Sequence, residues 1–110
     1  MTQQPHAFDD LMNSPVRLKI CAALATATAL EFTAIEDALG ISTSALAKQL
    51  RILGDAGYVT LDKRRQSFGR PRTWVSLTLL GRRAFDAHVK ALREMLDGAN
   101  TPPHQPPSPN

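Results

Sequence analysis

Apolar residues recur every three or four positions along much of this chain, which is the spacing of helices that bury one face. The pattern predicts four such helices. The first begins at Ser14-Pro15, and the other three cover 34–39, 43–56 and 79–97. In the first of these, a serine followed by a proline is typical of a helix start. Most of the chain is therefore expected to be helical.

Residues that start and stop helices lie at the ends of the two central segments. Thr33, with Glu36 three residues later, predicts a capping box. Gly40 can adopt the left-handed conformation that ends a helix, and Ser42 can cap the next one. Because only three residues separate the two helices, the segment is organised as a helix-turn-helix.

Two later segments alternate apolar and polar residues, as half-buried strands do. They cover 58–63 and 73–78, and the loop between them contains Gly69 and Pro71, which favour turns. A shorter strand is predicted around 30–32. The expected fold class is therefore α+β: mainly α, with a small β-hairpin after the helix-turn-helix.

The helix predicted over 43–56 has two unlike faces. Its leucines at 46, 50 and 53 lie within one third of the circumference and can enter a core. The opposite face carries short side chains and two cations: Ser42, Thr43, Ser44, Ala47, Lys48 and Arg51. Short side chains allow close approach, and the N-terminal N–H groups and hydroxyls can bind phosphates. This face suits the major groove of duplex DNA, although a capped surface helix with small residues would show the same pattern.

Positive charge is concentrated beside this helix. The chain carries a net +3, but residues 41–72 hold seven Lys and Arg against two Asp, a net +5, and the remainder is at −2. Four arginines flank or occupy the predicted hairpin loop: Arg64, Arg65, Arg70 and Arg72. A basic loop can lie along phosphates or insert an arginine into a narrow minor groove. A solvated loop would explain the charge but not its position beside the helix.

This succession of elements resembles winged helix-turn-helix transcriptional regulators of the MarR-like and ArsR-like superfamily, and most closely their small single-domain type. The resemblance spans about residues 8–96 and is carried by LGISTSALAKQLRILGDAGYV, GRPRT and LTLLGR. It implies that the short-residue face enters the groove of double-stranded DNA and that Arg70 lies near the tip of the wing. Relatives often carry histidine where this chain has Gln49, which the helical wheel places at the edge of the core. They often carry serine at Ala47, which here can offer only apolar contact.

The last helix has more apolar surface than one packing face needs, because its uncharged arc covers about half of the circumference. A symmetric homodimer formed by the N- and C-terminal helices would cover the surplus, as winged-helix relatives commonly do. The predicted interface residues are Phe8, Leu11, Met12, Phe85, Val89, Leu92 and Leu96. The alternative is a terminal helix wrapped deeply into its own domain.

The overall composition limits the architecture. A chain of 110 residues has room for one hydrophobic core. We expect residues 7–97 to form the winged helix domain, between a disordered N-terminus over 1–6 and a Pro-rich disordered tail over 98–110. There is no apolar run of about 20 residues and no signal-peptide layout at the N-terminus, so a cytoplasmic location without a membrane partner is expected.

Catalytic and metal chemistry are not expected. The three histidines are scattered, and no spacing of His, Cys or Asp suggests metal ligands. The single cysteine, Cys21, is interpreted as a small buried hydrophobe in preference to a thiol sensor. Because neither a Gly-rich phosphate loop nor a nucleophile–base pair is present, no enzyme and no cofactor are predicted. Whether a small-molecule effector exists is left open.

Taken together, these features predict a sequence-specific regulator of transcription that binds double-stranded DNA, a repressor acting as a homodimer on an inverted repeat. The alternative is a winged helix that serves as a protein–protein interaction module, since a fold does not determine a function. Such modules usually lose the basic wing and the short-residue helix face, and this chain has both.

Overall fold

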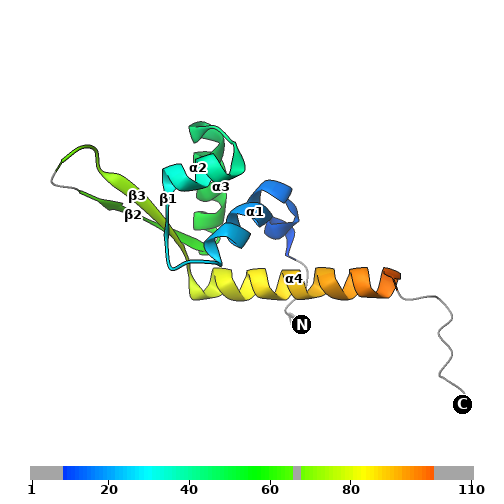
Figure 1. Ribbon diagram of the computed structural model, residues 1–110. Coiled ribbons are helices and arrows are strands. Elements are labelled where there is room, and N and C mark those ends of the chain that lie inside the picture. Colours follow the sequence, from blue (N-terminus) through cyan, green and yellow to red (C-terminus); the bar gives the residue numbers. More distant parts are fainter. Residues whose placement is uncertain (1–8, 66–67, 101–110) are drawn as a thin grey trace, which may run out of the picture.

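The computed structural model describes residues 9–65 and 68–100, without the side chains of 99 and 100. Its helices are η1 (Asp10–Asn13), α1 (Pro15–Leu24), α2 (Phe32–Leu39), α3 (Thr43–Asp55) and α4 (Leu79–Asn100), and its strands are β1 (Leu30–Glu31), β2 (Val59–Arg64) and β3 (Arg72–Leu77). Figure 1 shows α1, α2 and α3 grouped on one side of α4, with the β2–β3 hairpin projecting outward. The predicted class, mainly helical with a small hairpin, is confirmed.

The strands form one antiparallel sheet in the order β1-β3-β2. Strands β2 and β3 pair from Val59 and Leu77 near the core out to Arg64 and Arg72. The two-residue strand β1 pairs with β3 through Leu30 and Val75, and it confirms the short strand predicted there. The sheet thereby attaches the hairpin to the segment that leads into α2.

Local capping signals place most helix ends where the sequence predicts them. The Ser14 side chain accepts a hydrogen bond from the Arg17 N–H at 3.3 Å, and Pro15 occupies the first turn of α1. Gly40 ends α2 with a φ of 66°, in the left-handed region, and its N–H donates to the Glu36 carbonyl at 2.8 Å.

The start of α2 corrects one prediction. The helix begins at Phe32, with Glu31 as its N-cap and no side-chain hydrogen bond at the cap, so Thr33 caps nothing and lies inside the first turn. The reason is tertiary, because pairing of Glu31 with Trp74 keeps the backbone extended up to that residue. Phe32 then packs against the core from the first turn.

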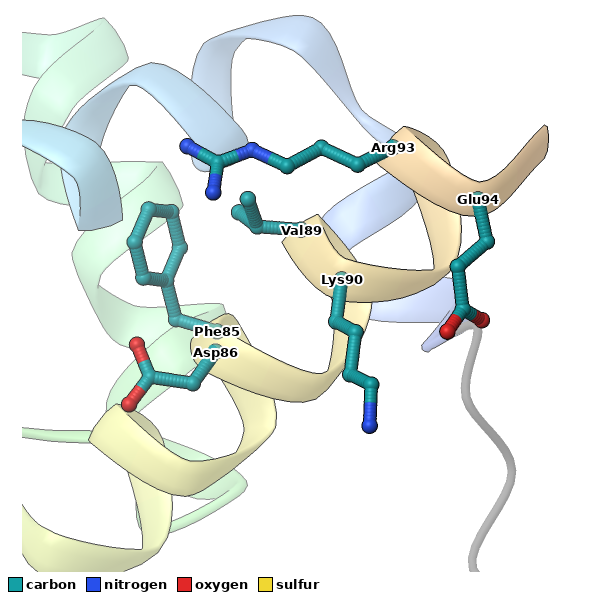
Figure 2. Close-up of a pocket in the computed structure, with 6 residues that line it drawn as sticks. All are labelled: Phe85, Asp86, Val89, Lys90, Arg93 and Glu94. Atoms are coloured by element: carbon teal, nitrogen blue, oxygen red, sulfur yellow. The ribbon is translucent and has the colours of Figure 1, made fainter. Parts of the chain in front are cut away.

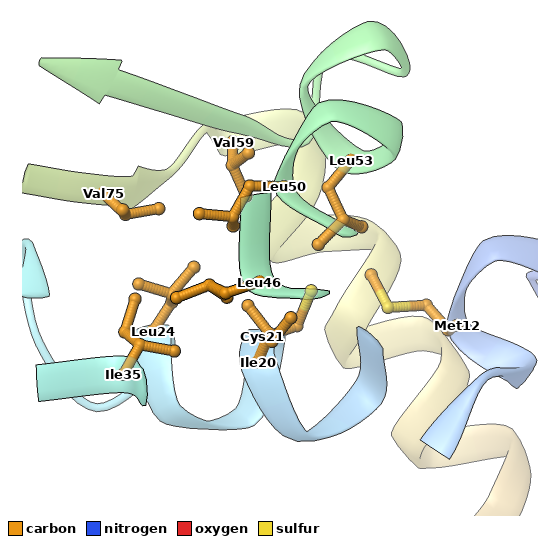
Figure 3. Close-up of a cluster of buried hydrophobic side chains, with 10 residues drawn as sticks. All are labelled: Met12, Ile20, Cys21, Leu24, Ile35, Leu46, Leu50, Leu53, Val59 and Val75. Atoms are coloured by element: carbon orange, nitrogen blue, oxygen red, sulfur yellow. The ribbon is translucent and has the colours of Figure 1, made fainter. Parts of the chain in front are cut away.

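The hydrophobic core lies between the helices η1, α1, α2 and α3, the base of the hairpin and α4. Its buried members, drawn in Figure 3, are Met12, Ile20, Cys21, Leu24, Ile35, Leu46, Leu50, Leu53, Val59 and Val75. Met12, predicted to face a second copy of the chain, is instead fully buried in its own domain. Apolar spacing alone does not say which surface a residue packs against, and here η1 folds back so that Met12 reaches the core.

Helix α4 begins after Thr78, whose hydroxyl accepts a hydrogen bond from the Gly81 N–H at 2.9 Å. Its domain-facing side is buried at Gly81, His88 and Ala91. The helix continues through Gly98 to Asn100, past the expected end at Asp97. Residues 98–100, predicted to belong to the tail, are therefore helical, and residues 101–110, like 1–8, lie outside the described residues.

A partly buried polar network that the sequence does not reveal connects the N-terminal segment to α4 and to the start of β2. The Asp9 N–H donates to Nδ1 of His88 at 3.0 Å, and the Tyr58 hydroxyl donates to the Asp9 carboxylate. Burial, with this hydrogen bond and the charge of Asp9, raises the pKa of Tyr58 to about 12. His88 and Tyr58 are therefore structural residues that hold η1 against α4.

Candidate nucleic-acid interface

The first turn of α3 is exposed and rich in hydroxyl groups. The Ser42 hydroxyl accepts a hydrogen bond from the Ala45 N–H at 3.1 Å, which confirms the predicted cap, and lies 3.3 Å from the Ser44 hydroxyl. Free N–H groups and the positive end of the helix dipole favour anions at such a terminus. This end of α3 can therefore approach a phosphate closely.

The structure separates the two faces of α3 as the sequence predicts. Leu46, Leu50 and Leu53 are at most 1% exposed and form part of the core. Every residue predicted to face the groove is exposed: Ser42, Thr43, Ser44, Ala47, Lys48 and Arg51. Lys48 and Arg51 form no ion pair with another described residue, so their charges remain available to an external anion.

Gln49 helps to position α3 and does not belong to its outer face. It is half-buried, and its side-chain oxygen accepts a hydrogen bond from the Arg17 guanidinium at 2.9 Å. The same guanidinium donates to the Leu11 carbonyl at 2.8 Å. Arg17 thus connects η1, α1 and α3, which fixes the orientation of α3 in the domain.

The junction between α3 and the wing is short and well hydrogen-bonded. Gly57 turns the chain with a φ of 81°, and the Tyr58 N–H donates to the Leu53 carbonyl at 2.9 Å. From the other end of the hairpin, the Thr78 hydroxyl donates to the Gly57 carbonyl at 2.6 Å. These bonds hold the base of the wing at a fixed position beside the C-terminus of α3.

All four arginines predicted for the wing are exposed, but they differ in their partners. Arg64 lies 3.1 Å from the Asp62 carboxylate and 5.2 Å from the centroid of the Trp74 ring. Arg72 forms an ion pair with Glu31 at 3.5 Å. Arg65 and Arg70 form no ion pair with the residues that the structure describes, so they are the unneutralised members of these four arginines.

The sequence did not predict the acidic partners of the wing arginines. Glu31 and Asp62 flank Trp74 on its two neighbouring strands, and Arg64 and Arg72 face each other across the hairpin. The arginines therefore lie beside a row formed by two carboxylates and an aromatic ring. Strand register brings Glu31 to Trp74 and Arg72, and Asp62 to Trp74, whereas Asp62 and Arg64 are two residues apart on β2.

The thiol of Cys21 belongs to the buried core and not to the exposed face of α3 or the wing. The residue has no exposed surface, and burial, with the nearby charge of Asp9, raises its pKa to about 11. A thiol in this state is protonated at neutral pH and is a poor nucleophile. The expectation of a small buried hydrophobe agrees with this position.

We expect native Cys21 to be alkylated by iodoacetamide at pH 8 at least ~100-fold more slowly than in the unfolded protein, because both access and thiolate are suppressed. Mass spectrometry of native and guanidinium-unfolded samples over time measures the ratio. Equal rates would show an accessible thiol and would restore the sensor interpretation.

Other kinds of site find no support in the described part of the chain. Within residues 9–65 and 68–100, no group of three or more His, Cys, Asp and Glu side chains is placed to hold a metal ion. None of the helices in these ranges has the length and apolar character needed to cross a bilayer.

A helix-turn-helix followed by a paired hairpin defines a winged helix protein. Residues 16–96 match the winged helix DNA-binding domain family, and the chain belongs to this family. The predicted resemblance to small winged-helix regulators is thereby confirmed. The family is one of DNA-binding domains and not of enzymes, in agreement with the prediction.

Solved structures share this fold. The transcriptional regulator homologue protein from Pyrococcus horikoshii OT3 is 27% identical, with a TM-score of 0.77 over 84% of this chain and 90% of that one. The YusO protein from Bacillus subtilis is 17% identical, with a TM-score of 0.70 over 84% and 67%. The Multiple Antibiotic Resistance Repressor, MarR, is 18% identical, with a TM-score of 0.68 over 79% and 62%. The last two show a common fold alone, and no curated protein matches the chain in sequence.

Proposed function

We propose that this protein regulates transcription by binding a specific sequence of double-stranded DNA, with α3 in the major groove and the wing on the neighbouring backbone or minor groove. The observation that carries the proposal is the outer face of α3, where all six short or cationic residues are exposed. Membership of a DNA-binding family and the regulator from Pyrococcus horikoshii support it. An ordinary solvent-facing helix would not need so many short side chains.

The exposed residues have distinct proposed roles. Ser42, Thr43 and Ser44 bind phosphates or base edges at the start of α3, whereas Lys48 and Arg51 reach acceptors on bases further along the groove. Ala47 permits close approach and offers apolar contact, for instance to a thymine methyl group. The wing arginines, Arg64, Arg65, Arg70 and Arg72, supply contacts to the phosphate backbone.

We further propose that the functional species is a homodimer on an inverted repeat. The C-terminal turns of α4 extend past the other helices in Figure 1, and there Met95 and Leu96 are 53% and 58% exposed. Figure 2 shows Phe85, Val89 and Arg93 bordering a hollow along one side of α4. Half-buried Leu11 and Leu92 remain candidates for the same interface. Phe85 is partly buried against its own core as well as bordering the hollow, and Phe8 lies outside the described residues.

The amount of sequence that must be read also supports a dimer. One recognition helix with one wing contacts only a few base pairs, too few to select one site in a genome. Two copies related by a two-fold axis would read half-sites about 10 bp apart, so the operator would be an inverted repeat. A dimer bound in this way at a promoter would exclude polymerase, which makes repression the simplest mode of regulation.

Selection of bound duplexes from a random DNA pool tests this proposal. The expected result is an enriched inverted repeat whose half-sites lie about one helical turn, ~10 bp, apart. The competing function, a protein–protein module, predicts no enriched motif even at low salt. That outcome would contradict specific DNA binding.

Substitutions on α3 and on the wing should have different effects. Lys48→Ala should change the preferred bases and cost ~1–3 kcal/mol on the selected duplex, because it removes a base contact. Arg70→Ala should weaken binding to all duplexes and reduce the slope of log K against log salt by about 1 per protomer. Titrations of the selected and a scrambled duplex at several salt concentrations measure both. Equal losses on the two duplexes for Lys48→Ala would contradict its assigned role.

A further inference from the structure

The wing carries an aromatic residue in addition to its arginines. Phe68 is 89% exposed, more than any other large hydrophobic residue that the structure describes. Single exposed apolar residues are common and mean little by themselves. Phe68 differs in its position, because it lies in the connection between β2 and β3, beside Gly69 with a φ of 83°.

The hairpin carries this residue away from the core. Val59 and Val75 are the buried residues of the two strands, and the rest of β2 is exposed. Pairing nevertheless continues out to Arg64 and Arg72, so the ribbon extends about 20 Å at ~3.3 Å per residue. Figure 1 shows the hairpin projecting from the body of the domain. The exposed ring therefore lies in the loop beyond the paired part of the hairpin, away from the residues that form the core.

The charges nearest to Phe68 in sequence are cationic. Arg65 and Arg70 lie three and two residues away, and both are exposed. Neither is neutralised by an acid among the described residues, unlike Arg64 and Arg72 at the paired end of the strands. Uncompensated arginines draw the tip toward phosphates. A single aromatic ring between cations suits a nucleic acid better than an apolar protein surface, which would need a larger apolar patch.

We propose that Phe68 enters the minor groove of the bound duplex as an apolar wedge and partly unstacks one base step beside the half-site that α3 reads. This inference rests on the proposed DNA-binding function and adds a specificity residue to it. Apolar side chains inserted from the minor groove open base steps and kink the duplex. Pyrimidine–purine steps yield most easily, so each half-site should carry a TA or CA/TG step under the wing. The protein thereby selects DNA by its deformability where α3 makes no contact.

The test compares wild type with Phe68→Ala and Phe68→Leu on the selected duplex, with 2-aminopurine replacing an adenine at the step under the wing. Wild type should raise the fluorescence of this probe, because unstacking relieves its quenching. Phe68→Ala should bind about tenfold or more weakly per protomer, by analogy with the loss of one base–aromatic contact. It should also lose the fluorescence rise at saturating protein. Phe68→Leu should keep part of that rise, because leucine still acts as a wedge.

Arg70→Ala is the matched control on the same loop. It should reduce the salt slope while keeping the fluorescence rise at saturation, whereas Phe68→Ala should leave the salt slope unchanged, because it removes no charge. Since Phe68 is exposed, its replacement should not alter the melting temperature.

Several outcomes would overturn the inference. Equal affinity and equal fluorescence for Phe68→Ala and wild type would remove Phe68 from the DNA contact while leaving the proposed function intact. A Phe68→Ala protein that binds DNA normally but loses mass in sedimentation would assign the ring to a protein contact. Failure of wild type to select any duplex would instead contradict the proposed function, and this inference with it.

Discussion

Replacing Gly81 with alanine is expected to destabilise the folded protein by about 3 kcal/mol, since the new methyl group has no room. A Cβ at this position would lie 2.1 Å from the Tyr58 carbonyl oxygen and 2.9 Å from two further backbone atoms of that residue. The oxygen cannot move aside easily, because it accepts a hydrogen bond from the Thr78 N–H at 2.9 Å. The first turn of α4 would have to shift away from the base of the hairpin.

The effect is measurable as a fall in melting temperature of roughly 12–24 °C, at about 4–8 °C per kcal/mol for a domain of this size. Gly98→Ala is the matched control, because it lies on the same helix with nothing within 4 Å of an added Cβ. It should leave stability unchanged or raise it slightly, as alanine favours helices over glycine. A Gly81→Ala protein that melts with wild type would mean that α4 does not approach Tyr58 this closely.

Charging the exposed end of α4 is expected to abolish both self-association and specific DNA binding. Met95→Glu with Leu96→Glu would place two carboxylates in the proposed interface without disturbing the core, because both side chains are more than half exposed. The sedimenting mass should fall from that of a dimer to that of a monomer. Affinity for the selected duplex should fall by about 1,000-fold or more, toward the value for random DNA.

Arg83→Glu supplies the control for this experiment. It makes the same change in charge on the same helix, on the exposed side opposite Leu96, and it should leave the dimer mass unchanged. A wild-type protein that is monomeric at micromolar concentration would contradict the homodimer. So would a doubly charged variant that keeps both its mass and its operator affinity.

Most residues of the candidate site could be predicted from the sequence, because the signals that identify them are local. The caps at Ser14, Ser42 and Thr78 each involve a side chain and a backbone N–H three residues later. The two faces of α3 follow from the helical period, and so the exposure of its outer residues could be predicted. The charge of the wing could be predicted as well, because charge is a property of residue type.

Features that depend on distant partners could not be predicted. Met12 has the spacing of an interface residue, yet it is buried because the Asp9–His88 hydrogen bond and the Arg17 contacts fold η1 onto α4 and α3. The start of α2 at Phe32 depends on strand pairing with β3. The pairing of Arg72 with Glu31 depends on the register between β1 and β3, whereas Arg64 pairs with Asp62 two residues away on the same strand.

The sequence by itself therefore determined most of the helices, the caps at Ser14 and Ser42, the cationic wing and the residues that face outward on α3, since each depends on contacts within about one helical turn or on residue chemistry. Only the tertiary structure decided which wing arginines remain unneutralised, why Gly81 must be glycine, and which apolar residues of η1 and α4 stay exposed. These properties arise from contacts between residues far apart in the chain, and a periodic pattern contains no information about the partner that it packs against.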